Sequence, residues 1–236
     1  MFTSLLLAVA FADEIGEGWL TRVDAANNEG EDAHLVLDLK VADAQGKTVE
    51  RSLEIWQKGD DKRLVKITAP PRLAGVALLI PDGETTYVYL PAYGRPKRVV
   101  GDQRSDAFLG TDFSIEELSR LAWAPEYEAT VEADEGATVR LAMVPEDPKA
   151  HKHQQAKMWV RKVDDLPSRI EYTAADGTPT RRVTLSGFAD AGGRPLAHHL
   201  KVEDLEGGTW TEATVRTATF DGGLDDSIFE LASLGD

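Results

Sequence analysis

Apolar residues recur with two different periods along the chain, and the first of these periods is helical. Within residues 13–28 the apolar positions are spaced by four, four and three residues; they are Ile15, Trp19, Val23 and Ala26. That spacing places all four side chains on one face of an α-helix. The sequence therefore predicts one amphipathic helix close to the N-terminus.

The rest of the chain alternates with a period of two, which is typical of half-buried strands. The first such run covers residues 35–41. Further runs are separated by polar clusters that contain glycine and suit hairpin turns; they cover residues 48–57, 63–69, 84–90, 126–132, 137–144, 155–163, 168–174, 180–188, 196–203 and 209–220. About ten or eleven short strands joined by hairpins predict a long antiparallel meander, and a sheet of that size must curl.

One segment in the middle of the chain interrupts the strands. Ser114 and Glu117 have the spacing of a capping box, and Phe113 and Leu118 occupy the two positions of a hydrophobic staple. A short helix is therefore predicted from about Ile115 to Leu121. Because strands precede and follow this helix, we expect it to pack across the sheet or over its opening.

The N-terminus carries the features of an export signal. An apolar run from Leu5 to Phe11 leads into Ala10-Phe11-Ala12, which has the small-x-small pattern of a cleavage site. We interpret residues 1–12 as a signal peptide and residues 13–236 as a single domain, because no repeat or linker-like composition divides them. No other stretch approaches the ~20 apolar residues of a spanning helix, so the mature chain is not expected to cross a membrane.

Acidic residues dominate the charge of the chain. The 41 Asp and Glu residues outnumber the 26 Lys and Arg residues, which gives a formal net charge of -15. Such a surplus repels phosphate backbones, so nucleic acid is not expected as a partner, and it favours a soluble monomer. The chain has no cysteine, which excludes disulfides and thiolate metal ligands.

Residues that could carry catalysis or bind a metal are few. His151 and His153 would face the same side of a strand and could share a metal ion, although residues 145–153 have the composition of a solvated loop. His198 and His199 are adjacent and would point to opposite faces of a strand. The acidic pairs fall in predicted turns; they are Asp60-Asp61, Asp164-Asp165 and Asp225-Asp226. No motif for nucleophilic catalysis or phosphate binding occurs, so we expect neither an enzyme nor a cofactor.

A basic group stands out in this acidic chain. Arg95, Lys97, Arg98 and Arg104 lie within ten residues of one another. Their side chains are candidates for contact with a phosphate headgroup or with an acidic partner protein. Alternatively, Arg98 and Arg104 could pair with a nearby carboxylate and fix the loop in place; the candidates are Asp102, Asp106 and Asp112.

The segment that contains this group resembles the bacterial outer membrane lipoprotein-sorting proteins. The resemblance rests on YVYLP at residues 87–91, on the spaced arginines that follow it, and on FLGTDF at residues 108–113 with EEL at residues 116–118. It extends to PPRLAGVALL at residues 70–79 and to DDSIF at residues 225–229. The chain departs from the family pattern at four positions: Val76 and Leu78 stand where the family usually has Thr and Phe, and Thr111 and Glu117 where Ser and Asp are commoner.

The resemblance implies a LolA/LolB-like fold, mainly β with a few helices. This fold is a curved antiparallel half-barrel with helices over its open side and an apolar cavity for acyl chains. It also implies an inner-membrane transporter of the RND type as a partner. The candidates for the cavity wall are Leu37, Leu39, Leu53, Ile55, Leu78, Ile80, Tyr87 and Tyr89 from the sheet, with Phe108, Phe113, Leu118 and Leu121 from the lid. At each of these positions ordinary core packing is the alternative.

The expected function is that of a periplasmic carrier or chaperone for lipid or lipoprotein acyl chains, with the segment from Phe113 to Leu121 as a movable lid. Burial of an acyl chain contributes roughly 0.8 kcal/mol per CH₂, so a single chain can supply on the order of 10 kcal/mol before ordering costs. Affinity of that size needs no catalytic group. The alternative is a ligand-sensing regulatory module of the cell envelope that binds a partner protein.

Overall fold

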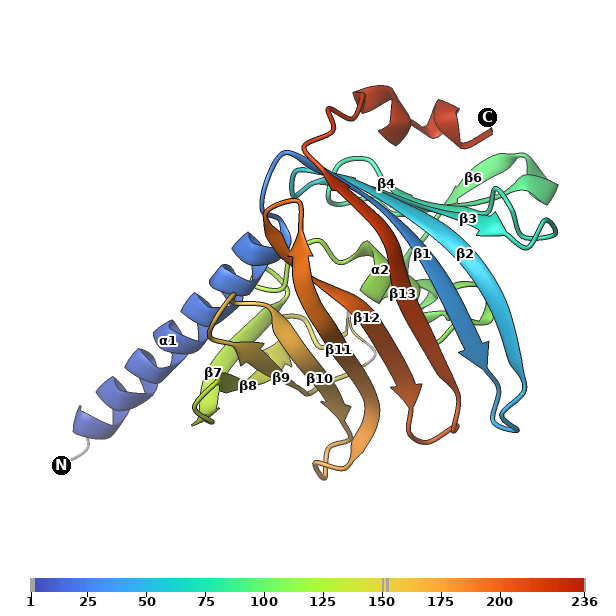
Figure 1. Cartoon of the computed structure of the whole chain (residues 1–236). Helices are drawn as coiled ribbons and strands as arrows, with labels where there is room; N and C mark the ends of the chain where they lie inside the picture. The colour runs from blue at the N-terminus through green and yellow to red at the C-terminus, as the bar shows by residue number, and fades with distance from the viewer. Residues whose placement is uncertain (1–2, 150, 152, 236) are drawn as a thin grey trace. The chain divides into compact units, whose positions relative to one another are not determined.

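The computed structural model describes residues 3–149, 151 and 153–235, with side chains from residue 14 onward (Figure 1). The chain folds into two compact units, each built from separate stretches of sequence. Unit 1 takes its described residues from the ranges Met1–Glu29 and Ala122–Leu185, and unit 2 from Gly30–Leu121 and Ser186–Asp236. The predicted signal peptide, residues 1–12, lies outside the residues whose side chains are described. Its cleavage stays a prediction.

Unit 1 combines one long helix with an antiparallel meander. Its strands pair with their neighbours in the sequence, with β7 at the edge. The elements are α1 (Thr3–Asn27), β7 (Tyr127–Asp134), β8 (Thr138–Pro145), β9 (Ala156–Arg161), β10 (Pro167–Thr173) and the first part of β11 (Pro179–Ala191).

Helix α1 packs along β7 with a different stripe from the one predicted. Leu20 and Val23 are fully buried, whereas Ile15 is 56% exposed. The stripe is shifted because Gly16 is the point of closest approach: a Cβ added there would lie 2.0 Å from the carbonyl oxygen of Ala129 in β7. The helix itself is confirmed, and the predicted buried stripe is right at Val23, wrong at Ile15 and only half-buried at Trp19 and Ala26.

Unit 2 is built around three long strands, β2, β1 and β13, which lie side by side in Figure 1. β1 pairs with β2 on one side and with β13 on the other, so the first and last strands of this unit are neighbours. The ladder order is β6-β5-β4-β3-β2-β1-β13-β12, followed by the second part of β11. The bounds are β1 (Asp32–Ala42), β2 (Thr48–Lys58), β3 (Lys62–Ala69), β4 (Ala77–Ile80), β5 (Tyr87–Leu90), β6 (Arg95–Arg98), β12 (Arg194–Asp204) and β13 (Trp210–Phe220).

The two faces of the unit 2 sheet have different coverings. We call lid face the side that carries Leu37 and its cross-strand partners Leu53 and Val215, because residues 108–121 pack on this side through bonds described below. We call tail face the other side. There Leu64, Ala77, Leu79 and Tyr89 form a cluster with Phe229 and Leu234 of the C-terminal 3-10 helices η4 (Asp226–Phe229) and η5 (Leu231–Gly235).

The predicted mainly β fold with an N-terminal helix and a short helix in mid-chain is confirmed. All eleven predicted strands are present, and β4 and β6 are additional. Both missed strands have only four residues, and β6 contains Pro96 and three basic residues, a composition that suits an edge strand and hides the alternation. Among the described residues, no helix is both long and apolar enough to span a bilayer.

Candidate functional site

The lid segment, residues 108–121, combines the 3-10 helix η3 (Phe108–Gly110) with the short helix α2 (Ile115–Ser119). The capping box is present as predicted, because Ser114 Oγ accepts from the backbone N–H of Glu117 at 3.1 Å and Glu117 Oε2 accepts from the N–H of Ser114 at 2.9 Å. The helix ends two residues earlier than predicted, since Arg120 has an extended backbone. The stretches between and after these two short helices are irregular, and backbone groups there and at the helix ends need partners from elsewhere.

Arg63 of β3 supplies two of these partners. Its Nη1 donates to the carbonyl oxygens of Leu118 at 3.0 Å and of Arg120 at 2.7 Å. Its Nε and Nη2 donate to Gln57 Oε1 of β2 at 3.1 and 2.5 Å. Burial lowers the pKa of Arg63 to about 10, which leaves the guanidinium charged at neutral pH. The end of the lid segment is thus held by a cation that belongs to the sheet.

Two further attachments hold the start of the lid segment. Arg51 of β2 donates to the carbonyl oxygen of Leu109. In addition, Asp112 accepts from the hydroxyls of Thr209 and Thr211, with the Thr211 bond at 2.7 Å, while its own N–H donates to Thr211 Oγ1 at 2.9 Å. Thr211 is fully buried. The lid segment is therefore bonded to three regions of the unit 2 sheet.

These anchors were missed in the sequence, although a signal for them exists. Arg51 lies two residues before Leu53, and Arg63 lies two residues before Val65. Each arginine therefore points to the same face of its strand as a buried apolar residue. A cation on the buried, apolar face of a strand needs a hydrogen-bond or ion-pair partner there. That partner proves to be the backbone of the lid segment in both cases.

Ten of the twelve predicted cavity residues lie on the lid face or in the lid segment. Those on the sheet are buried except for Ile55, which is half-buried; they are Leu37, Leu39, Leu53, Ile55, Leu78 and Ile80. In the lid segment Phe108 and Phe113 are buried, and Leu118 and Leu121 are half-buried. The role of these ten residues in ligand binding stays a prediction.

The structure does not bring Tyr87 and Tyr89 together with the other ten. The register pairs Leu78 of β4 with Val88 of β5, so Val88 and Leu90 are on the lid face and the two tyrosines are on the tail face. Tyr89 packs there against the C-terminal cluster. In the YVYL pattern both faces of the strand carry apolar or aromatic side chains. Only the register with β4 therefore decides which two side chains face the lid segment.

A hollow of about 790 Å³, which we call the hairpin hollow, lies beside the lid segment within unit 2. Val88 and Leu90 of β5 and Ile115 of α2 form its apolar part. Lys97 and Arg95 of β6 stand directly across from Val88 and Leu90 in the sheet register. The other lining residues are Tyr93, Pro96, Arg98, Val99, Gln103 and Asp106.

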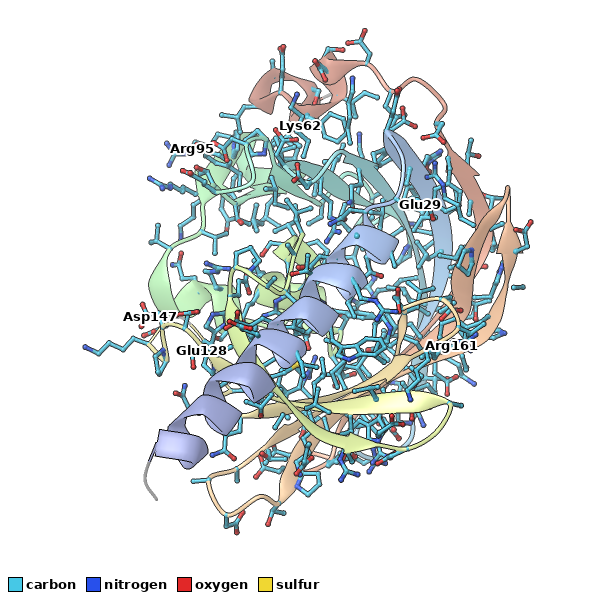
Figure 2. All side chains as sticks on the ribbon, turned by 90° about the vertical axis from the view of Figure 1, so that its left-hand side faces the viewer. Glu29, Lys62, Arg95, Glu128, Asp147 and Arg161 are labelled. Carbon is cyan, nitrogen blue, oxygen red and sulfur yellow. The ribbon has the colours of Figure 1, made fainter. Side chains whose placement is uncertain are left out.

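Three of the four predicted basic residues line the hairpin hollow. Arg95, Lys97 and Arg98 are exposed, and Figure 2 shows Arg95 at the outer margin of the sheet. Within the described chain, neither Arg95 nor Lys97 has a carboxylate at salt-bridge distance. Arg104 lies in the 3-10 helix η2 (Gly101–Ser105), is half-buried and does not line the hollow.

Arg98 lies near an acid that the sequence did not suggest. The backbone N–H groups of Thr85 and Glu84 hold the pKa of Asp82 below its usual value, and the charge of Arg98 adds to this effect. Asp112, which had been considered as a partner for the arginines, is bonded to the β13 side of the sheet instead. Arg95 and Lys97 thus face the hollow without an ion pair among the described residues.

The histidines and acidic pairs take structural positions. The ring of His151, which is buried, lies 5.0 Å from the ring of Tyr127, and His153 lies 4.6 Å from that of Tyr172, so the expectation of a solvated loop is wrong for His151. The predicted positions in or next to turns are confirmed for Asp60-Asp61 and Asp164-Asp165, whereas Asp225 caps the 3-10 helix η4 and Asp226 is its first residue. In two of them an Asp binds a nearby group: Asp225 accepts from the N–H of Ser227, and Asp164 binds Arg161.

Unit 1 has a hollow of its own, smaller than the hairpin hollow. Its volume is about 480 Å³, and its lining includes Ala129, Met143 and Ala156 together with Glu17 and Lys157. None of the predicted site residues lines it. The predicted site residues therefore gather in unit 2 and not around this second hollow.

Comparison with known structures identifies the fold. The fold matches an outer membrane lipoprotein-sorting protein domain from Vibrio parahaemolyticus at 22% identity and a TM-score of 0.83, covering 95% of this chain and all of that one. A DUF1329 family protein from Desulfovibrio piger gives 22% identity and a TM-score of 0.85 over 94% and 99% of the two chains. A LolA superfamily protein from Nitrosomonas europaea gives 18% and 0.74 over 91% and 97%. The chain thus has the fold of the lipoprotein-sorting and LolA proteins, as its sequence resemblance predicted.

A family model places the chain more narrowly. The model, whose description reads "Uncharacterized protein", matches residues 59–236, and the chain belongs to this family. A comparison with curated protein sequences finds no match. The family region contains the whole lid segment, all of β5 and β6, and the Arg63 anchor.

Proposed function

We propose that this protein is a periplasmic carrier or chaperone that binds lipid or lipoprotein acyl chains. The hairpin hollow is the observation that carries the proposal. Its volume of about 790 Å³ lies within the range of ~300–1,000 Å³ that is usual for small-molecule sites. Val88, Leu90 and Ile115 give it an apolar part, and two cations without ion pairs stand beside that part.

The arrangement suits a ligand with a long apolar chain and an anionic head. Each buried CH₂ contributes roughly 0.8 kcal/mol, so the apolar part can supply most of the affinity. Arg95 and Lys97 would bind the phosphate or carboxylate of the head, because such charge-assisted hydrogen bonds are stronger than neutral ones. Arg98 reaches the same hollow, and Arg104 remains a candidate contact for a partner.

The lid segment would regulate entry to the interior. Ile115 belongs both to the wall of the hairpin hollow and to α2, so a shift of the lid segment would join the hollow to the lid face beneath. The ten predicted cavity residues on the lid face and in the lid segment would then extend the site for longer chains. The polar anchors at Arg51, Arg63 and Thr211 would fix the closed position.

The wider setting follows from the sequence. Export by residues 1–12 would place a single mature domain of residues 13–236 in the periplasm as a monomer that acts without a cofactor. An inner-membrane transporter of the RND type would deliver or receive the cargo. No enzymatic activity is part of this proposal, because binding alone accounts for the hollow.

Native mass spectrometry of the protein, purified from an envelope fraction without detergent, tests the proposal. We expect acyl lipids to be bound, and Leu90→Glu to lower the occupancy about tenfold, equivalent to ~1.4 kcal/mol. The matched control is Val163→Glu, since Val163 is 80% exposed and lies outside the hollow. Repeated preparations without acyl ligand, together with no binding of an added fluorescent fatty acid, would refute the carrier. A stoichiometric complex with a signalling protein that survives lipid extraction would instead favour the regulatory module.

A further inference from the structure

The edge strand β6 and its flanks form an exposed strip of unusual composition. In residues 93–100, which we call the edge strip, Arg95, Lys97 and Arg98 are exposed. Tyr93 before β6 is 72% exposed, and Val100 after it is 56% exposed. The strip thus combines two exposed apolar side chains with three cations. It contains no acidic residue, although the whole chain has a formal net charge of -15.

Protection of a sheet edge explains only part of this composition. Charged side chains and a proline are common on edge strands, because they prevent pairing with another chain. Pro96 removes a backbone donor from β6, so an added peptide strand would also bind poorly here. Edge protection does not require an exposed tyrosine and an exposed valine at the two ends of the strand.

We propose that the edge strip docks on an anionic lipid bilayer. Arg95, Lys97 and Arg98 would bind lipid phosphates, because basic clusters are attracted to anionic leaflets. Tyr93 would sit at the headgroup level, where the ring and the hydroxyl of tyrosine are both accommodated. Val100 would enter the same boundary layer. The acidic remainder of the surface is repelled by the same lipids, so attraction through this strip selects one orientation.

The strip is continuous with the hairpin hollow. Tyr93, Arg95, Lys97 and Arg98 belong to both. Docking would therefore place the hollow at the bilayer surface, where a lipid could enter without crossing bulk water. The attraction comes from a few screened charges, so binding should be reversible and weakened by salt. Docking itself requires no cargo, and it goes beyond the carrier function proposed above.

Vesicle flotation tests the docking directly. The mature chain is mixed with vesicles of phosphatidylcholine alone or of phosphatidylcholine with phosphatidylglycerol, at low and at high salt. We expect binding only to the vesicles with phosphatidylglycerol, and its loss at high salt. The double variant Arg95→Glu/Lys97→Glu should lower the apparent affinity at least about tenfold. Tyr93→Ser should lower it a few-fold.

Matched controls separate the strip from net charge. The double variant Lys47→Glu/Lys149→Glu changes the charge by the same amount at two exposed lysines outside the strip, and Val163→Ser removes an exposed apolar side chain elsewhere. Both controls should bind like the unaltered chain. An equal loss in both double variants would overturn the proposal. Absence of binding to either vesicle at low salt would also overturn it and point to an acidic protein as the partner of the strip.

A parallel measurement of lipid removed from the vesicles distinguishes docking from carriage. Binding through the strip without lipid removal would refute the carrier function and support docking. Full retention of both lipid removal and vesicle binding in the Arg95→Glu/Lys97→Glu variant would support acyl-chain carriage, overturn docking and also refute the headgroup role proposed for Arg95 and Lys97. Circular dichroism of each variant confirms that the fold is retained.

Discussion

Helix α1 and the lid segment cover their sheets in different ways. Helix α1 is long, satisfies its own backbone, and approaches β7 so closely that only glycine fits at position 16. The lid segment contains only two short helices, and three of its carbonyl groups accept hydrogen bonds from Arg51 and Arg63 of the sheet. Helix α1 also has polar contacts, since Asp24 accepts from the N–H groups of Trp123 and Ala124, but these hold a loop next to the helix and do not replace its own hydrogen bonds.

Helix α1 and the lid segment differ in how easily each could move away from the apolar face that it covers. A regular helix that packs by close backbone contact loses that contact over its whole length when it shifts, because packed interiors are dense. A segment held by a few side-chain bonds can exchange them for bonds to water one at a time. In the proposed carrier, the bonds from Arg51, Arg63 and Thr211 would therefore mark the cover that opens.

The largest effect is expected from the close contact of α1. In Gly16→Ala the new Cβ would lie 2.0 Å from the carbonyl oxygen of Ala129, so the helix or β7 must shift. We expect the free energy of unfolding to fall by about 3 kcal/mol, as for other overpacked contacts. Urea titration of the mature chain measures this change.

A second glycine in the same helix provides the control. Gly18 has open space around it, so Gly18→Ala should leave stability unchanged or raise it by up to ~1 kcal/mol through helix propensity. Equal behaviour of the two alanine variants would show that α1 is not held by close backbone contact.

A smaller but more local effect is expected at the lid anchor. Arg63→Met leaves the carbonyl groups of Leu118 and Arg120 without their donor, so we expect a loss of about 2 kcal/mol. Hydrogen exchange should become faster in residues 108–121 and stay unchanged in α1. Arg216→Met, which removes an exposed ion pair with Asp38, is the control and should cost about 0.5 kcal/mol or less. Unchanged exchange in the lid segment would contradict the anchoring role.

Features that depend on the local sequence pattern were predicted correctly for the most part. Features that depend on contacts between distant segments were missed. The capping box of Ser114 and most hairpin strands depend on neighbours in the chain and were found; only the four-residue strands β4 and β6 were missed. The face of Tyr87 and Tyr89 depends on the register between β5 and β4, and the buried stripe of α1 depends on where Gly16 meets β7. Neither contact can be recognised from the hydrophobic pattern of the strand or helix alone.

The candidate site shows the same division. The basic group was found because its charge is unusual for the chain, and three of its members line the hairpin hollow. Arg51 and Arg63 were passed over because their partners are backbone carbonyls more than fifty residues away. Nothing in the sequence near Leu109 or Leu118 indicates that a cation will bind there.

Thr211→Val tests the other end of the lid segment with little change of shape. The substitution removes the hydroxyl that bonds Asp112 in both directions, and Thr209 remains as a partner. We expect a loss of about 1.5 kcal/mol and faster exchange at residues 108–113. The exposed Thr214 lies on the same strand, and Thr214→Val should change stability by less than about 0.5 kcal/mol. Equal losses in both variants would contradict a specific role for the Thr211 hydroxyl.

The smallest effect concerns pH and the chain leading to the C-terminal segment. The Asp32 carboxylate accepts from the N–H groups of Gly222, Gly223 and Leu224 at 2.7 to 2.8 Å. Burial on its own would raise the pKa of Asp32, but these three hydrogen bonds outweigh it and hold the pKa below its ordinary value. The group therefore adds stability that is complete above the pKa of the unfolded chain and is lost as the pH falls through the lower, folded value.

Asp32→Asn should thus cost about 1 kcal/mol at neutral pH and less in acid. The difference between the unaltered chain and the variant has to be compared at each pH, because Asp225 and Asp226 also have a lowered pKa and contribute to the acid sensitivity of both proteins. We expect that difference in unfolding free energy to shrink between about pH 5 and pH 3. A constant difference over this interval would mean that the carboxylate charge does not stabilise the turn at residues 222–224. The hydrogen bonds between this turn and residue 32 would then not depend on pH.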